Sequence, residues 1–492
     1  MPEAIPADPL DEIDLVLEPE PEPSGHPVPL RPYQIADLSF LIGQKRALLL
    51  HDPGGGKTPP VCVWLYYLWT HEKVRSIWVM PKSLLKKNKV ELHRFTHFAD
   101  ADVVIVDGPK AANALATDAK VFLMGADRFK KVWRDLQKRL PDVQALAADE
   151  VHMYWSTHSS ARTQDLYQAA LKFPYFVGMT GTLIDGRLTS AYPMINVIEP
   201  RYYLTYGRFL KEHTTEDPFG GVIWQNTDKI VRILGRHAIK RSFESIYGKE
   251  NKVLQTEVCD MEEKQREAYS EFERSAVLDL EPYGGRHGGG TVLSTNEAAV
   301  AAMRCRQIMA APELFGILKP GALTGKDEQL KLHLENHKAS GKPLVVFGCF
   351  RAEIERIGRL VESMGLTVGT LHGETTTKAR GELDENFRAG KVQVLVGSPA
   401  VAAIGFNWEH CDHIVFTSLD YRDSSVMQGI RRCIRGVRAT PLLVTFLEYE
   451  KSLDQRIMKI VRHKSQLAAR IDETREVYSL SQASSRPKEK TV

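Results

Sequence analysis

Residues 51–60 read HDPGGGKTPP and place three glycines directly before a lysine and a threonine. Glycines let successive backbone N–H groups converge on an anion, and a helix that begins at the turn adds its positive dipole end. An apolar run precedes the stretch and an apolar helical pattern follows it, which is the context of a phosphate-binding loop. We therefore expect Lys57 to hold the β and γ phosphates of a nucleotide and Thr58 to bind Mg²⁺. The loop itself would be formed by Gly54, Gly55 and Gly56.

The two prolines that follow this loop, Pro59 and Pro60, fit the same interpretation. N–H groups in the first turn of a helix have no partner within the helix, so a proline removes no hydrogen bond there. Taken alone, the stretch is also compatible with a glycine turn beside a solvated lysine.

A pair of carboxylates ends the apolar segment LAADEVH, residues 146–152. A nucleotide site needs one carboxylate to hold the metal and another to orient and deprotonate the attacking water, both at the carboxyl end of a strand. We expect Asp149 and Glu150 to supply them. Two adjacent acids on a turn are often only solvated, and it is the preceding buried strand together with Lys57 that favours the functional interpretation.

Two further motifs carry polar groups that suit phosphoryl transfer. The segment GMTGTLIDG, residues 178–186, follows another apolar run with Thr180, Gly181 and Thr182. The segment QGIRRCIRG, residues 428–436, has one helical face formed by Gln428, Arg432 and Arg435. Phosphoryl transfer needs cations at the γ-phosphate, and an arginine finger is worth about a thousandfold or more in rate. Taken alone, the first motif is equally compatible with a polar turn, and the second with an exposed basic helix.

The elements that must position these groups form a repeating pattern. Short apolar runs alternate with helical patterns twice over, which predicts an α/β fold with two lobes, each built on a parallel sheet. In the first half we expect strands at residues 47–50, 76–80, 103–106, 121–124, 143–148 and 176–179. In the second half we expect strands at residues 344–347, 367–371, 392–396, 413–417 and 442–446.

The segment between the two lobes, residues 205–340, reads as mainly helical. It is interrupted by EPYGGRHGGGT, residues 281–291, where the density of glycine predicts a mobile loop. The expected organisation is an acidic, proline-rich tail (1–29), a first lobe (30–204), a helical insertion or linker (205–340), a second lobe (341–475) and a C-terminal tail (476–492).

Composition limits the partners and the location. The net charge of +3 hides an asymmetry: residues 1–29 hold eight acids and no Lys or Arg, so the remainder carries +11, which is compatible with a polyanionic partner. No apolar run reaches the roughly 20 residues that a membrane helix needs, and the acidic start is unlike a signal peptide. The six cysteines show no zinc spacing. We expect an intracellular protein without a membrane partner, cytoplasmic or nucleoid-associated, or in the host cytoplasm if it is viral.

In their order along the chain, these motifs and the preceding LRPYQIADLSFLI resemble the Swi/Snf-type ATPases of helicase superfamily two. Other stretches follow the same order: WVMPKSLL is similar to motif Ia, VFLMGADRFKK to motif Ib, and TGTLIDGRLTSAYPMINVIEP to motif III. The resemblance runs from about Leu30 to Ala468, nearly the whole chain. It implies two RecA-like lobes with ATP, and hence Mg²⁺, in the cleft between them.

The resemblance also implies a role for each matching residue. Gln34 would read adenine, Thr58 and Asp149 would hold the metal, and Glu150 would act on the attacking water. Coupling of hydrolysis to DNA would fall to His152, Thr180, Gly181 and Thr182. Motif V would be formed by Gly405 and Asn407. The γ-phosphate would be reached from the second lobe by Arg432 and Arg435, on the helix that also carries Gln428.

The chain departs from the family at several points. It has PGGGKT where the family usually has Met-Gly-Leu-Gly-Lys-Thr, KKNK where a tryptophan usually follows motif Ia, and an extra glycine in AAIGFN. Its last motif closes with RGVRATP. None of these changes removes a catalytic group, so we expect a divergent member for which nucleosome remodelling does not follow.

The resemblance implies an ATP-dependent motor that translocates mainly on duplex DNA and grips phosphates without reading bases. One alternative is a helicase that separates strands of DNA or RNA, because the wedge that splits strands can be a single aromatic residue or hairpin. A second alternative is an ATP-dependent clamp on DNA with negligible turnover. The intact Lys57, Glu150 and Arg435 argue against the clamp.

Overall fold

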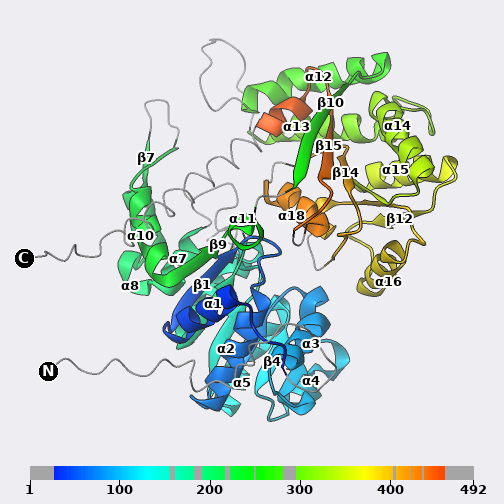
Figure 1. The fold of residues 1–492 in the computed structure, drawn as a ribbon. Helices are drawn as coiled ribbons and strands as arrows, with labels where there is room; N and C mark the ends of the chain where they lie inside the picture. Colours follow the sequence, from blue (N-terminus) through cyan, green and yellow to red (C-terminus); the bar gives the residue numbers. More distant parts are fainter. Residues whose placement is uncertain are drawn as a thin grey trace, which may run out of the picture. The chain divides into compact units, whose positions relative to one another are not determined.

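The fold is taken from a computed structural model of the chain. It describes residues 27–155, 161–181, 191–216, 222–248, 251–280, 295–402, 406–420, 423–434 and 437–459. These residues form two compact units that divide after Gly248 (Figure 1). The first 26 residues, the whole glycine-rich stretch 281–291 and the expected C-terminal tail lie outside the described residues, so the expectations for them stay predictions.

The first lobe is built on a seven-stranded sheet in the order β3-β4-β2-β5-β6-β1-β9, and every neighbouring pair is parallel. Its strands are β1 (Arg46–His51), β2 (Arg75–Val79), β3 (Val103–Ile105), β4 (Val121–Met124), β5 (Val143–Ala148), β6 (Tyr175–Met179) and β9 (Ala238–Arg241). The six strands expected in the first half are therefore confirmed to within two residues. The seventh, β9, was not expected.

Helices cover both faces of this sheet, because successive residues of its strands point to opposite sides. In β1, Ala47 and Leu49 belong to one buried apolar cluster, and Leu48 and Leu50 belong to another. The first cluster is completed by α1 (Pro32–Ile42), α2 (Thr58–Thr70) and α3 (Leu85–Phe95). The second is completed by α5 (Ala126–Arg139), α6 (Ala161–Lys172), α7 (Tyr192–Ile198) and α10 (Thr227–His237). With both faces buried, polar groups gather in the loops at the strand ends.

The smaller elements of the first lobe lie mostly after β6 in the chain. They are α4 (Ala111–Leu115), α8 (Pro200–Tyr203), α9 (Tyr206–His213), α11 (Phe243–Tyr247) and an antiparallel pair of strands, β7 (Thr214–Glu216) and β8 (Val222–Trp224). Figure 1 draws α4 in blue and the elements that follow β6 in green.

Arg46 anchors the start of β1, the strand that leads into the glycine-rich loop. Its guanidinium group donates hydrogen bonds to the carbonyls of Ala170, Leu171 and Phe173 at the end of α6, and to that of Val197 in α7. The last carbonyls of a helix have no partner within the helix, so one arginine satisfies several of them. The base of β1 is thereby held against two helices.

The second lobe is built on a six-stranded sheet in the order β10-β15-β14-β11-β13-β12, again entirely parallel. Its strands are β10 (Lys252–Cys259), β11 (Leu344–Phe347), β12 (Val368–Leu371), β13 (Val394–Gly397), β14 (His413–Phe416) and β15 (Leu442–Tyr449). Its helices are α12 (Glu263–Leu280), α13 (Thr295–Ala310), α14 (Gly325–Ser340), α15 (Arg351–Ser363), α16 (Thr377–Arg388), α17 (Pro399–Ala402) and α18 (Asp423–Cys433). The expected α/β fold with two parallel-sheet lobes is confirmed.

The segment 205–340 contains more than the helices expected of it. It supplies β9, which pairs with β1 at the edge of the first sheet, and β10, which pairs with β15 at the edge of the second. Both are edge strands with polar residues, and β10 is exposed along much of its length. Neither shows the buried apolar run by which the other strands were recognised. The expected domain boundaries themselves stay a prediction.

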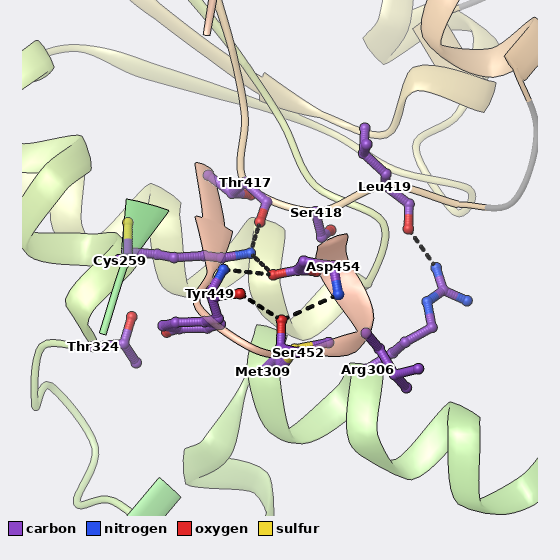
Figure 2. A network of polar contacts seen from close by, with 12 residues as sticks. Cys259, Arg306, Met309, Thr324, Thr417, Ser418, Leu419, Tyr449, Ser452 and Asp454 are labelled. Carbon is purple, nitrogen blue, oxygen red and sulfur yellow. Dashed lines mark hydrogen bonds and ion pairs between the residues drawn. The ribbon is translucent and has the colours of Figure 1, made fainter. Parts of the chain in front are cut away.

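A buried ion pair between Lys326 and Asp454 lies at one end of the second sheet (Figure 2). The Lys326 ammonium group, only 4 % exposed, donates to Asp454 Oδ2 at 2.5 Å and to the Thr417 carbonyl at 2.6 Å. The same oxygen of Asp454 accepts the Tyr449 N–H at 3.2 Å. Burial opposes the lysine charge, but Asp454 and Tyr449 outweigh it and raise the pKa of Lys326 above its ordinary value. The pair joins the first turn of α14 to the ends of β14 and β15.

Two other expectations concern the cysteines and the membrane. All six cysteines are free thiols, and five of them are buried, which agrees with the absence of a zinc-binding spacing in the sequence. Among the helices in the described part of the chain, none combines the length and apolar character needed to cross a lipid bilayer.

Candidate active site

Three neighbouring strands of the first sheet bring the expected site residues to one edge. The strands β5, β6 and β1 are adjacent and parallel, so their carboxyl ends meet. The loop after β1 carries the glycines and Lys57, β5 leads into Asp149 and Glu150, and β6 leads into Thr180. Segments about 100 residues apart in the sequence therefore converge at one end of the sheet.

The glycines of the loop are required by its backbone and by its surroundings. Gly54 and Gly56 have φ angles of 86° and 65°, in the left-handed region that favours glycine. A Cβ on Gly56 would lie 2.7 Å from Tyr33 Oη, and one on Gly55 would lie 3.0 Å from the Asp52 carbonyl oxygen. The helix α2 begins at Thr58, which confirms that the two prolines lie in its first turn.

The two polar side chains expected to bind nucleotide both contact this loop. The Lys57 ammonium group donates to the carbonyl of His51 at 2.9 Å, so it lies at the carboxyl end of β1. The Gln34 amide is buried, donates to the Gly56 carbonyl at 3.2 Å and accepts the Arg31 N–H at 2.9 Å. Gln34 thus links the start of α1 to the loop, and its role toward adenine stays a prediction.

Asp149 is the more buried of the two carboxylates, with 7 % of its surface exposed. Its Oδ1 accepts the backbone N–H of Glu150 at 2.9 Å. Burial, with Glu150 adding to its effect, raises the pKa of Asp149 to about 7, although Lys57 and the Asn88 amide oppose the rise. A divalent cation would favour the ionised form. The Thr58 hydroxyl and the Asp149 carboxylate are oxygen donors of the type that Mg²⁺ prefers.

Glu150 has a left-handed backbone, with φ at 49°. A residue other than glycine held in this region costs roughly 1–3 kcal/mol, and such strain is common at functional sites. Its carboxylate Oε2 lies 3.3 Å from His152 Nδ1, which in turn lies 2.8 Å from Thr180 Oγ1. His152 therefore connects the acid after β5 to the threonine after β6, and its role in coupling stays a prediction.

Gly181 touches the phosphate loop directly. A Cβ at this position would lie 2.8 Å from Pro53 Cδ and 3.2 Å from the His51 carbonyl oxygen. Because a proline ring cannot rotate away, we expect Gly181→Ala to displace the loop and raise the KM for ATP about tenfold, the usual cost of overpacking being about 1–3 kcal/mol. Steady-state ATPase rates against ATP concentration measure this effect. The control is Gly235→Ala, at a position with no atom within 4 Å of the added Cβ, and an equal effect of both variants would contradict the expectation.

In the second lobe, α18 carries the expected arginine and glutamine. The Arg432 guanidinium group is 7 % exposed and donates to the Phe406 carbonyl at 3.4 Å, while the Arg432 carbonyl accepts the Trp408 N–H at 2.7 Å. The segment that contains the exposed Asn407 is thereby bonded to the helix, on which Gln428 is half-buried. Reach to a γ-phosphate stays a prediction. Three expected residues lie outside the described part of the chain: Thr182, Gly405 and Arg435.

Sequence reasoning missed several polar residues around the loop. Asp37 and His51 are fully buried, Arg241 donates to Asp37 at 2.7 Å, and the Tyr247 hydroxyl donates to the Gly54 carbonyl at 3.4 Å. The available signal was weak: Asp37 lies three residues after Gln34 on α1, and His51 interrupts an apolar strand at its last residue.

Comparison with known proteins matches two family models to this chain. Residues 33–314 match the SNF2-related domain, and residues 325–437 match the helicase conserved C-terminal domain. The ATP-dependent RNA helicase DBP3 of Cryptococcus neoformans is 32% identical over 141 residues, which are 27% of this chain and 23% of that protein. A Caenorhabditis elegans homologue of a SWI/SNF-related regulator of chromatin containing DEAD/H box 1 is 24% identical over 149 residues, 30% of this chain and 15% of that protein.

One solved structure, the Sulfolobus solfataricus SWI2/SNF2 ATPase core in complex with dsDNA, is similar over 91% of this chain and 93% of its own, with 19% identity and a TM-score of 0.41. Another ATP-dependent RNA helicase DBP3, from Phaeosphaeria nodorum, is 23% identical over 154 residues, 31% of this chain and 26% of that protein. The chain thus matches about a quarter or less of the length of these curated relatives.

Proposed function

Because this chain belongs to the SNF2-related family, whose model covers more than half of it at residues 33–314, we propose that it is an ATP-driven motor that moves along duplex DNA. The observation that carries the proposal is the convergence of Lys57, Asp149 and Glu150 at the carboxyl ends of β1 and β5, the two strands that flank β6 in the first sheet. A phosphate cradle beside two carboxylates is the arrangement that hydrolysis of a nucleoside triphosphate needs.

Each group of the first lobe has a defined task in this proposal. Lys57 and the N–H groups of the loop bind the phosphates, and Glu150 orients a water molecule and accepts its proton. Thr58 and Asp149 hold Mg²⁺, which supplies positive charge for the phosphate oxygens.

The second lobe supplies the remaining cations. Arg432 belongs to the second unit of the chain, and Arg435 follows it in the same sequence motif, so in this proposal hydrolysis would require the two lobes to close on the nucleotide. A thousandfold effect of an arginine finger corresponds to about 4 kcal/mol of barrier, enough to make closure the switch for hydrolysis. DNA that bridges both lobes favours closure, and alternating closure and opening moves the lobes along the backbone.

Duplex DNA is the proposed track. Single-stranded DNA and RNA are the two alternatives that the experiment below distinguishes from it. The charge of +11 outside the first 29 residues supports binding to a phosphate backbone. Two of the relatives are named ATP-dependent RNA helicases, which makes strand separation on RNA the second candidate function.

We expect the ATPase rate to be stimulated more strongly by a blunt DNA duplex than by single-stranded DNA or by RNA. In the presence of ATP, the protein should displace the third strand of a triplex while it unwinds a forked duplex poorly. Binding should be insensitive to sequence and fall with salt at a slope of about −0.9 per phosphate contact. The two displacement assays, run side by side with the same protein, are the measurement. Efficient fork unwinding together with stimulation by single strands or RNA would replace the translocase by the helicase.

A further inference from the structure

All three glycine carbonyls of the phosphate loop accept a hydrogen bond from a side chain. The donors come from three different elements and span 3.2 to 3.4 Å: Tyr247 Oη to Gly54, His51 Nδ1 to Gly55 and Gln34 Nε2 to Gly56. In a trans peptide the carbonyl and the following N–H point in opposite directions. Holding the carbonyls of Gly55 and Gly56 on the protein side therefore turns the N–H groups of Gly56 and Lys57 to the other side.

His51 is the first of three polar residues in mutual contact beside the loop, of which His51 and Asp37 are fully buried and Arg241 is half-buried. A carbonyl oxygen only accepts, so Nδ1 of His51 must carry the proton that it donates to Gly55. The other ring nitrogen, Nε2, faces Asp37 Oδ2 at 3.5 Å, and neither side chain is exposed. The second oxygen of Asp37 accepts from Arg241 Nε at 2.7 Å, and Arg241 also donates to the Tyr33 carbonyl at 3.2 Å.

These groups join three elements that the hydrolytic chemistry does not otherwise connect. Asp37 lies on α1, His51 ends β1, and Arg241 ends β9, the edge strand beside β1. Burying a carboxylate is costly unless it is paired and hydrogen-bonded. Burial raises the pKa of Asp37 to about 6, although Arg241 opposes the rise. Asp37 and His51 have no place among the groups that bind metal or activate water, and their contacts lead to the Gly55 carbonyl.

We propose that His51, oriented by Asp37 and Arg241, is a positioning residue for ATP. It fixes the direction of the Gly55 carbonyl, and so presents the N–H of Gly56 to the phosphates before the nucleotide arrives. The inference rests on the proposed function of the loop. A loop ordered in advance binds its anion without first losing conformational freedom, so the effect of His51 falls on ATP binding rather than on the chemical step.

Two substitutions separate the hydrogen bond to Gly55 from the mere filling of space. Asparagine places its amide nitrogen where His51 has Nδ1, and can still donate to the Gly55 carbonyl. Glutamine reaches toward the place of Nε2, and can contact Asp37 but not Gly55. The matched control is His213→Gln, because His213 is a fully buried histidine of the same lobe whose Nδ1 also contacts a carbonyl, that of Gln225, at 3.1 Å.

The measurements are the Kd of the full chain for a fluorescent ATP analogue, and the KM and kcat of its ATPase. Losing one hydrogen bond and leaving a buried carbonyl unpaired should make His51→Gln raise Kd and KM about tenfold, with kcat at saturating ATP within about threefold. His51→Asn should restore most of the affinity, and His213→Gln should not alter it. Circular dichroism establishes that each variant is folded.

The outcomes distinguish this inference from the proposed function. If the unaltered protein binds no ATP, the proposed function fails. If it binds ATP but His51→Gln binds equally well, or His51→Asn is as weak as His51→Gln, the positioning role is overturned while the function stands. If His51→Gln does not fold, Asp37→Leu takes its place: it removes the carboxylate that faces the ring and offers no hydrogen bond in exchange, and normal ATP affinity in that variant would likewise overturn the role.

Discussion

Replacing Glu150 by glutamine is expected to lower single-turnover ATP hydrolysis at least about a hundredfold, while the protein still binds ATP. Glutamine has the size of glutamate but cannot accept a proton from water. The backbone at this position is left-handed, and the carboxylate lies 3.3 Å from His152. An exchange that preserves size should disturb this geometry little, so the loss reports on proton transfer and not on the fold.

The companion variants define what the loss means. Lys57→Ala should lower hydrolysis by a similar factor, because the phosphates lose their fixed cation, but unlike Glu150→Gln it should also weaken ATP binding. Arg435→Ala should lower hydrolysis at least about a hundredfold, as expected for an arginine at the γ-phosphate. Glu244→Gln, at an exposed glutamate of α11, is the control. Near-normal turnover in Glu150→Gln would remove Glu150 as the base.

Replacing Asp454 by leucine is expected to lower the free energy of unfolding of the second lobe by about 3–5 kcal/mol, because it leaves the buried Lys326 ammonium group without its counter-charge. Of its two hydrogen bonds in the described part of the chain, the ammonium group then keeps only the one to the Thr417 carbonyl. The double variant Lys326→Met with Asp454→Leu should recover much of the loss, since two apolar side chains of similar size remove both charges together.

Urea unfolding, combined with hydrogen exchange of peptides from β14 and β15, measures this loss and localises it to the second lobe. The control is Glu355→Gln, which breaks the exposed pair of Glu355 with Arg351 on α15 and should cost less than about 1 kcal/mol. If the double variant is less stable than the Asp454→Leu variant, the ion pair is not the source of the effect.

The glycine-rich loop shows how far local sequence leads. Its context could be predicted because a buried parallel strand is a short apolar run, and because prolines within a helix are tolerated only in its first turn. The same reasoning located the strands before Asp149 and Thr180. The loop and these strands depend on neighbours within about ten residues, so local sequence is sufficient to predict them.

The side chains and strands that surround the loop could not be predicted from local sequence. The edge strands β9 and β10 are specified by pairing with strands that lie far away in the sequence, and their own residues carry little apolar pattern. Arg241 reaches Asp37 only because β9 lies beside β1.

The sequence by itself determined the two α/β lobes and the candidate phosphate, metal and water groups, since each follows from residue type and local periodicity. Tertiary structure alone decided which side chains donate hydrogen bonds to the carbonyls of the loop. It also decided that Gly181 lies against Pro53 and that Asp37 contacts His51. The physical reason is that hydrogen bonds and close contacts between distant segments depend on strand order and on the few tenths of an ångström left by packing. Neither strand order nor these packing distances can be recognised from a pattern of residues in the sequence.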